Sequence, residues 1–246
     1  MAVIAHQTGV EWQERLGLVV EAIRAWPDWR GEVARRMRAE EGTAVQGQAA
    51  LYAYAQYVRD FITLMCAVLG KAPAADERFW KLAMNLHDEL GGFTGIDAAH
   101  GKMLRGIGDQ LDETTRQRCR EAVETAHRGL HDQLAMLDWP INLFALGPGT
   151  ESISDLFLVP LEHWGAKAAK ASAGAQLYFD SHRPQVESEH QMEIRRVIAM
   201  ELEQMDPSEA SVIWNSGVNA AEATARIHLA ALENGFRVSL AATEAQ

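Results

Sequence analysis

Apolar residues recur at intervals of three and four along most of the chain, the spacing of one face of an α-helix. The longest and most apolar of these stretches covers residues 46–70, and Gly70 and Pro73 end it. A helix of this composition belongs at the centre of a bundle. The same periodicity predicts further helices at residues 10–26, 29–41, 76–90, 96–111, 114–137, 150–172, 178–206 and 208–233.

Strand patterns are nearly absent from the sequence. Only residues 236–241 alternate in a way that suggests a strand, and no repeat or long linker divides the chain. Its 246 residues suit one large helical domain. We therefore predict an all-α, single-domain fold of about eight to ten helices. Within it we expect N-terminal helices at residues 1–45, a helical core at 46–235 and a C-terminal tail at 236–246.

Composition excludes several classes of partner. Apolar residues make up 48% of the chain, enough for a full core, and the net charge of -11 gives no basic surface for nucleic acid or anionic membranes. No apolar run is long enough to span a bilayer, and the first residues do not resemble a signal peptide. The two cysteines, Cys66 and Cys119, lack metal-type spacing, and we expect both to be buried thiols in a cytoplasmic protein.

Histidines and carboxylates gather in three segments that are predicted to be helical. The first segment holds His87, Asp88, Glu89 and His100, the second Glu151, Glu162 and His163, and the third His182, Glu187, Glu189 and His190. Inward-facing carboxylates and imidazoles on separate helices are how di-iron and di-manganese sites are built in bundles. Oxygen and imidazole ligands suit iron or manganese better than structural zinc. Each residue alone has an ordinary structural explanation, so the argument for a metal rests on their joint occurrence.

The third segment leaves two geometries open. Glu187 and His190 are three residues apart, so a helix places them on one face. His182 precedes Glu187 by five residues, and Pro184 lies between them. Either the helix starts near Pro184 with His182 outside it, or a bulge brings all three to one side. In a regular helix Glu189, seven residues after His182, would be its partner instead.

Four segments resemble, in order, those of the haem-oxygenase-like di-iron oxidases, also described as iron-containing redox enzymes. They are YAQYVRDF at residues 54–61, NLHDELGG at 85–92 with His100, GPGTE at 147–151, and YFDSH to ESEH at 178–190. The resemblance covers roughly residues 45–235 and implies a haem-oxygenase-like helical bundle.

The resemblance also implies a function. It predicts a non-haem iron enzyme, with two ions expected and manganese as a substitute, that uses O2 to oxidise a small molecule such as an amino acid or fatty acid derivative. A homodimer is one possible assembly. The implied catalytic metal ligands are Glu89, His100, Glu151, His182, Glu187 and His190. The implied substrate-pocket residues are Tyr57, Trp80, Phe144 and Trp164.

The sequence departs from the family pattern at two places. The family has its acid four residues after the first histidine of the last motif, whereas here the gap is five. The family's first core helix usually carries a glutamate, whereas residues 46–70 contain none and Asp60 is their only acid. These departures keep an alternative open: a metal-free member of the fold acting as a cofactorless oxidase, a hydrolase or a binding protein.

Other catalytic motifs are missing from the sequence. It contains no GxSxG, P-loop, GxGxxG, CxxC or HExxH sequence. His127 and His131 are four residues apart on one predicted helix, a spacing that can bind a metal, but the surrounding RGLHDQ sequence indicates an exposed face.

Overall fold

The computed structural model describes residues 8–38, 43–73, 77–92, 104, 106–109, 111–156, 158–159, 161–162, 173–181 and 184–241. Every regular element within these residues is a helix, which confirms the all-α prediction. No helix of this described part is both long and apolar enough to cross a bilayer.

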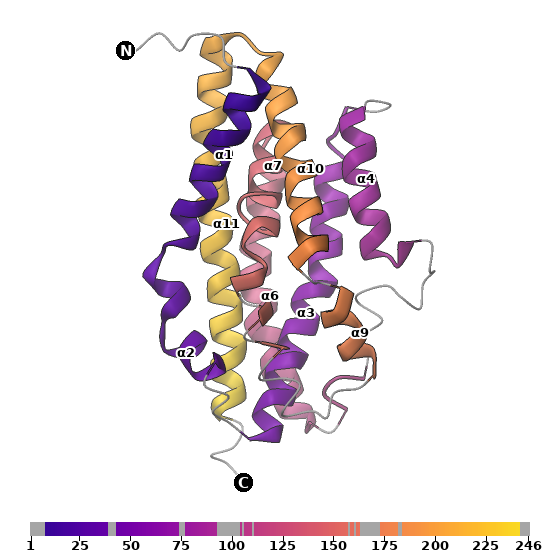
Figure 1. Cartoon of the computed structure of the whole chain (residues 1–246). Coiled ribbons are helices and arrows are strands. Elements are labelled where there is room, and N and C mark those ends of the chain that lie inside the picture. The colour runs from indigo at the N-terminus through magenta and orange to yellow at the C-terminus, as the bar shows by residue number, and fades with distance from the viewer. Residues whose placement is uncertain are drawn as a thin grey trace.

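Three long helices form the centre of the bundle and run side by side along its length (Figure 1). They are α3 (Ala44–Leu69), α6 (Glu113–Met136) and α11 (Pro207–Ala241). Hydroxyl and carboxylate caps fix where two of them start: Thr43 forms a capping box with Gln46 on α3, and Asp112 accepts the Thr115 amide of α6. The short helix α7 (Trp139–Leu146) packs against α11, and all but one of its residues are buried.

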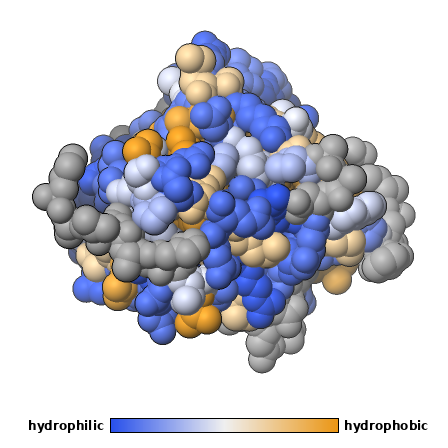
Figure 2. Space-filling model, turned by 90° about the horizontal axis from the view of Figure 1, so that it is seen from above, coloured by the Kyte–Doolittle hydropathy of each residue, from blue (hydrophilic) through white to orange (hydrophobic). Residues whose placement is uncertain are grey.

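The remaining helices cover this centre. Helix α10 (Pro184–Glu203) packs between α1 (Gly9–Arg24), α4 (Glu77–Glu89) and α7. The other described elements are η1 (Pro27–Arg30), α2 (Glu32–Arg38), η4 (Glu151–Ile153) and α9 (Ala173–Ser181). Hydrophilic residues dominate the described surface seen from above in Figure 2, and apolar ones appear there singly or in small groups. The apolar faces of the helices are thus turned into the bundle.

The predicted strand at residues 236–241 is wrong, because α11 continues as a helix to Ala241. Phe236 is buried and lines a cavity together with Ala53 of α3 and Val123 of α6. Gly235 makes this packing close, since a Cβ atom there would lie 2.8 Å from the Cβ of Ala53. Burial against two neighbouring helices outweighs the weak local preference for a strand.

The helix predicted at residues 96–111 does not extend through its last part. Residues 106–109 form turns, in which Gly106 and Gly108 have φ angles of 83° and 91°. Residues 96–103 lie outside the described part. A positive φ angle is incompatible with a right-handed helix, so these glycines end any helix before them.

Two smaller expectations are also resolved. Helix α10 begins at Pro184, as the first of the two geometries proposed for this segment requires, while His182 itself lies outside the described residues. The two cysteines are not both buried: Cys119 is buried, whereas Cys66 is exposed, and both are free thiols. Burial raises the pKa of Cys119 to about 11, which keeps it protonated and unreactive.

Candidate functional site

Glu89 and Glu151 line the same small cavity, whose volume is about 30 Å³. Both side chains are buried, with exposed fractions of 6% and 5%. Glu89 is the last residue of α4 and Glu151 is the first of η4, so two separate elements bring them together. The cavity has room for one or two water-sized groups. The other residues that line it are Tyr54, Tyr57, Val58, Phe61, Thr150, Ser154, Leu158 and Tyr178.

Helix α3 forms the aromatic wall of this cavity. Tyr54, Tyr57 and Phe61 follow one another at helical spacing, and the rings of Tyr57 and Phe61 lie nearly parallel with centroids 6.4 Å apart. The hydroxyl of Tyr54 is 2.7 Å from that of Tyr178, which ties α9 to α3. Bulky rings held in this way separate the carboxylates from bulk water.

The turn between α7 and η4 places Glu151. A Cβ atom on Gly149 would lie 2.7 Å from the carbonyl oxygen of Ala145 and 2.8 Å from that of Ala221 on α11. Only glycine allows the chain to approach these backbones so closely. The Glu151 carbonyl then accepts hydrogen bonds of 3.0 Å from Ser154 Oγ and from Gln191 Nε2 of α10.

His190 lies where α10 meets α4. Its Nε2 atom is 3.6 Å from Oδ2 of Asp88, the residue before Glu89, and 15% of its side chain is exposed. The structure therefore brings His190 close to one of the two cavity elements, but His190 does not itself line the cavity.

The other predicted ligands fall where the structure gives no side-chain description. His100 and His182 lie outside the described residues, as does the predicted pocket residue Trp164. Glu187 belongs to α10 by its backbone, while its side chain and those of Asp60 and Glu189 lie outside what is described. Among the described residues, no three His, Cys, Asp or Glu side chains converge closely enough to hold a metal ion.

The predicted pocket residues occupy different places. Tyr57 lines the cavity, as described above. Trp80 is 62% exposed on α4 and is not part of the lining. Phe144 has no exposed surface and packs its ring edge-on against Trp214, with centroids 5.7 Å apart. Trp80 and Phe144 therefore lie outside this cavity.

Two buried histidines flank Tyr57, and the sequence interpretation of one of them was wrong. His127 of α6 is 1% exposed, although its neighbours suggested an exposed face. The centroids of the His127 and His228 rings each lie 5.0 Å from that of Tyr57. The signal for burial was present, because His127 continues the apolar series of α6, which contains Cys119, Val123, Leu130 and Leu134.

The hydrogen bonds of His228 fix its tautomer. Thr150 donates its hydroxyl proton to the carbonyl oxygen of Ala145 at 2.9 Å, so it accepts from Nε2 of His228 at 2.7 Å. Nδ1 of His228 then carries a lone pair, is buried and makes no hydrogen bond with any described group. Burial, with a smaller contribution from His127, holds the pKa of His228 well below its ordinary value. His228 is therefore a neutral base.

A second cavity of about 30 Å³ adjoins the aromatic wall. Tyr54 and Tyr57 line both cavities, and the remaining residues of the second are apolar: Ala50, Ala53, Val123, Leu161, Ala231, Leu232 and Phe236. The two tyrosines thus stand between a space that holds carboxylates and a space that suits an apolar group.

Comparison of the sequence with protein-family models finds no match, and comparison with curated proteins finds none either. The resemblance to the haem-oxygenase-like oxidases therefore stays a prediction, and the function is argued from the geometry of the site.

Proposed function

We propose that this protein is a non-haem iron-dependent oxidoreductase with a haem-oxygenase-like bundle, and that it uses O2 to oxidise a small molecule. The observation that carries this proposal is the pair of buried carboxylates, Glu89 and Glu151, on one cavity. Carboxylate oxygens are ligands that iron and manganese accept. Two buried carboxylates from separate elements beside one cavity therefore suit a metal ion.

The donor chemistry of the site fits iron. Carboxylate oxygen and imidazole nitrogen are ligands that iron and manganese accept readily. The residues that would hold two metal ions between them are Glu89 and Glu151 on the cavity and His190 beside Asp88, together with His100, His182 and Glu187 from the sequence prediction. A bound iron ion would supply the redox chemistry with O2, and the protein would supply orientation and a dry cavity.

The chain's own residues have defined parts in this proposal. Tyr54, Tyr57 and Phe61 separate the carboxylates from bulk water, and the hydrogen bond between Tyr54 and Tyr178 holds this aromatic wall in place. The apolar cavity behind the tyrosines suits the non-reacting part of a small substrate.

Anaerobic addition of ferrous iron tests the proposal. We expect the wild-type protein to retain iron through gel filtration, and Glu89→Gln and Glu151→Gln each to weaken iron binding by at least about tenfold, because each removes a charged ligand. The matched control is Glu124→Gln, which changes an exposed carboxylate on α6 and should bind iron like the wild type.

The measurement is metal content by mass spectrometry, followed by O2 consumption of the iron-loaded protein. Equal iron retention by the wild type and the Glu89→Gln, Glu151→Gln double variant would show that the carboxylate pair is not the metal site. Failure of the wild type to retain iron would favour the metal-free alternative, in which the cavity only binds a small molecule.

A further inference from the structure

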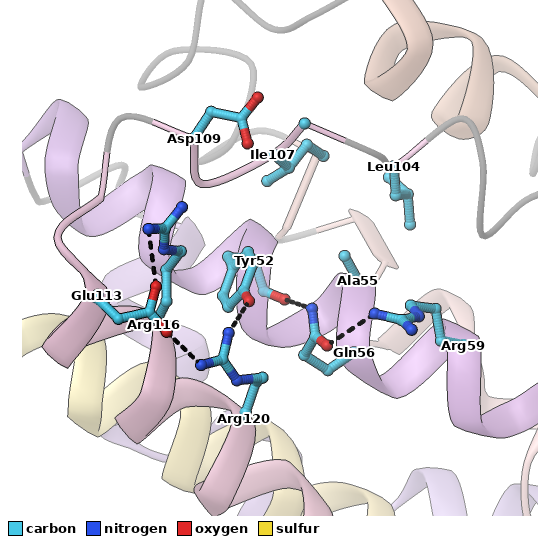
Figure 3. Close-up of a pocket in the computed structure, with 11 residues that line it drawn as sticks. Tyr52, Ala55, Gln56, Arg59, Leu104, Ile107, Asp109, Glu113, Arg116 and Arg120 are labelled. Carbon is cyan, nitrogen blue, oxygen red and sulfur yellow. Dashed lines mark hydrogen bonds and ion pairs between the residues drawn. The ribbon is translucent and has the colours of Figure 1, made fainter.

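A larger pocket of about 390 Å³ lies on the opposite face of α3 from the carboxylate cavity. Tyr52, Ala55, Gln56 and Arg59 line it at helical spacing, whereas Tyr54 and Tyr57 face inward. The turn residues 104 and 106–109 and the start of α6 complete the pocket (Figure 3). Its volume is in the range of small-molecule binding sites.

Two arginines of α6 in this pocket are held by one carboxylate. Glu113 accepts a bond of 2.6 Å from Nη2 of Arg120 and pairs at 2.8 Å with Nη2 of Arg116. Arg120 also donates to the hydroxyl of Tyr52 at 2.9 Å. The hydrogen bond from Arg120 is the main reason why the pKa of Glu113 is lowered, so Glu113 is ionised. This network fixes the α6 side of the pocket before any ligand arrives.

Among the described cations that line the pocket, Arg59 lacks such a partner. Its only hydrogen bond within the described part of the chain is a long one of 3.4 Å from Nη1 to Oε1 of Gln56. A guanidinium carries five N–H donors, so most of those on Arg59 are available to a ligand. Arg116 adds a buried Nε that makes no hydrogen bond with described groups.

The charges that line the pocket indicate what it accepts. Among the described residues that line the pocket, three arginines face two carboxylates, Glu113 and Asp109, which leaves one uncompensated positive charge. Asp109 stands on the turn across from the arginines in Figure 3, where it would repel a doubly charged anion. A single negative charge is the best match.

The walls of the pocket near Arg59 are apolar. Ala55 of α3 and Leu104 and Ile107 of the turn are buried and line the pocket. Gly108 lets the turn approach α3, since a Cβ atom there would lie 2.5 Å from the Tyr52 ring. A ligand that ends in a carboxylate and continues as an apolar chain satisfies both features.

We propose that this pocket binds a small organic monocarboxylate, with its carboxylate on Arg59 and its apolar part against Ala55, Leu104 and Ile107. The site is separate from the proposed metal site and does not depend on the oxidase function.

Hexanoate serves as the probe, and saturation-transfer NMR titration of the full chain measures its binding. We expect hexanoate to bind, and 1-hexanol and inorganic phosphate each to bind on the order of tenfold more weakly, since each lacks one of the two features. Higher salt should weaken hexanoate binding, because the ion pair is partly exposed.

Variants locate the site. Arg59→Gln should raise the Kd of hexanoate on the order of tenfold, and Arg59→Lys should raise it less. Arg128→Gln, an exposed arginine on α6, is the matched control and should leave the Kd unchanged. Glu151→Gln should also leave it unchanged, which separates this pocket from the carboxylate cavity.

Three results would overturn the proposal. They are equal binding of hexanoate by Arg59→Gln and the wild type, equal binding of 1-hexanol and hexanoate, and tighter binding of phosphate than of hexanoate. Because Arg59 is exposed, Arg59→Gln should keep the helical circular dichroism of the wild type, so a loss of binding reports the contact itself.

Discussion

Replacing a single glycine by alanine should change the stability of this bundle in opposite directions, depending on what surrounds the glycine. A methyl group on Gly149 would collide with two backbone carbonyl oxygens, at 2.7 Å and 2.8 Å, whereas one on Gly129 of α6 would meet nothing within 4 Å. Gly149→Ala should therefore lower the free energy of unfolding by about 1–3 kcal/mol. Gly129→Ala should raise it by up to about 1 kcal/mol, because alanine favours the helix.

Urea unfolding of the two variants beside the wild type provides the measurement. The prediction fails if both substitutions change the stability in the same direction. Because Gly149 precedes Glu151 by two residues, Gly149→Ala should also disturb iron binding, and Gly129→Ala should not.

His228 makes stability depend on pH. Its pKa in the folded protein lies well below the ordinary value of 6.5, because it is buried and lies near His127. Below about pH 6.5 the unfolded chain takes up a proton at this residue while the folded chain does not. Neutral His228 therefore makes its full contribution to the free energy of unfolding above that pH. As the pH falls, this contribution decreases by up to about 1.4 kcal/mol per pH unit.

Urea unfolding between about pH 7.5 and pH 5.5 measures this loss. In His228→Asn the free energy of unfolding should fall less steeply with pH, by up to about 1.4 kcal/mol per pH unit. This change in slope is expected even if the substitution also alters the stability at neutral pH. His131→Asn is the control, since His131 is partly exposed on α6. An unchanged slope in His228→Asn would show that the residue takes up its proton in the folded state too.

At the scale of single residues, the sequence predicts whether a side chain is buried better than it predicts which side chains it contacts. The apolar period of α6 marks His127 as inward-facing, although its polar neighbours suggested the reverse. Nothing in the sequence pairs it with His228 or Tyr57, because these residues lie on other helices and meet only through tertiary packing.

At the scale of the elements, Glu201 joins three helices. Its Oε1 atom accepts a hydrogen bond of 2.6 Å from Trp139 Nε1 of α7 and pairs at 3.0 Å with Arg78 Nη1 of α4. The Arg78 and Glu201 side chains are only 12% and 9% exposed. Removing one member of such a pair leaves the other charge buried without full compensation.

Glu201→Ala should accordingly lower the free energy of unfolding by about 3 kcal/mol. The exposed residue Glu203 on the same helix provides the control, and Glu203→Ala should cost less than about 0.5 kcal/mol. Chemical denaturation followed by tryptophan fluorescence measures both variants. Similar losses for the two would mean that the interaction of Glu201 with Trp139 and Arg78 contributes little.

Several helices were predictable, although the single helix expected at residues 178–206 is wrong, because this segment is divided between α9 and α10. The expected bounds of α1, α3, α4 and α6 differ from the observed ones by only one or two residues, because caps, prolines and glycines mark their ends. The end of α11 was missed because Phe236, Val238 and Leu240 alternate like a strand, while Leu229, Leu232, Phe236 and Leu240 fit a helix. The apolar residues there fit both the strand period and the helical period, and contacts with α3 and α6 determine that the segment is helical.

At the scale of the whole molecule, the meeting of Glu89 and Glu151 was expected from the joint occurrence of acids and histidines and from the family resemblance. The apolar period of each helix does not show which helices are neighbours. The pocket around Arg59 was not predicted at all. Its arginines and acids lie on α3, α6 and a turn, and in the sequence each one resembles an ordinary exposed charge.

The position of α11 in the chain has a consequence for how the protein is made. Its 35 residues pack against α3, α6 and α7, all of which leave the ribosome earlier. At about 5–20 residues per second, synthesis of α11 takes about 2–7 s. Throughout that interval the apolar faces that α11 will cover remain open to other nascent chains. We expect the nascent protein to need a chaperone at this stage, and to complete its core only once the last turns of α11 have emerged.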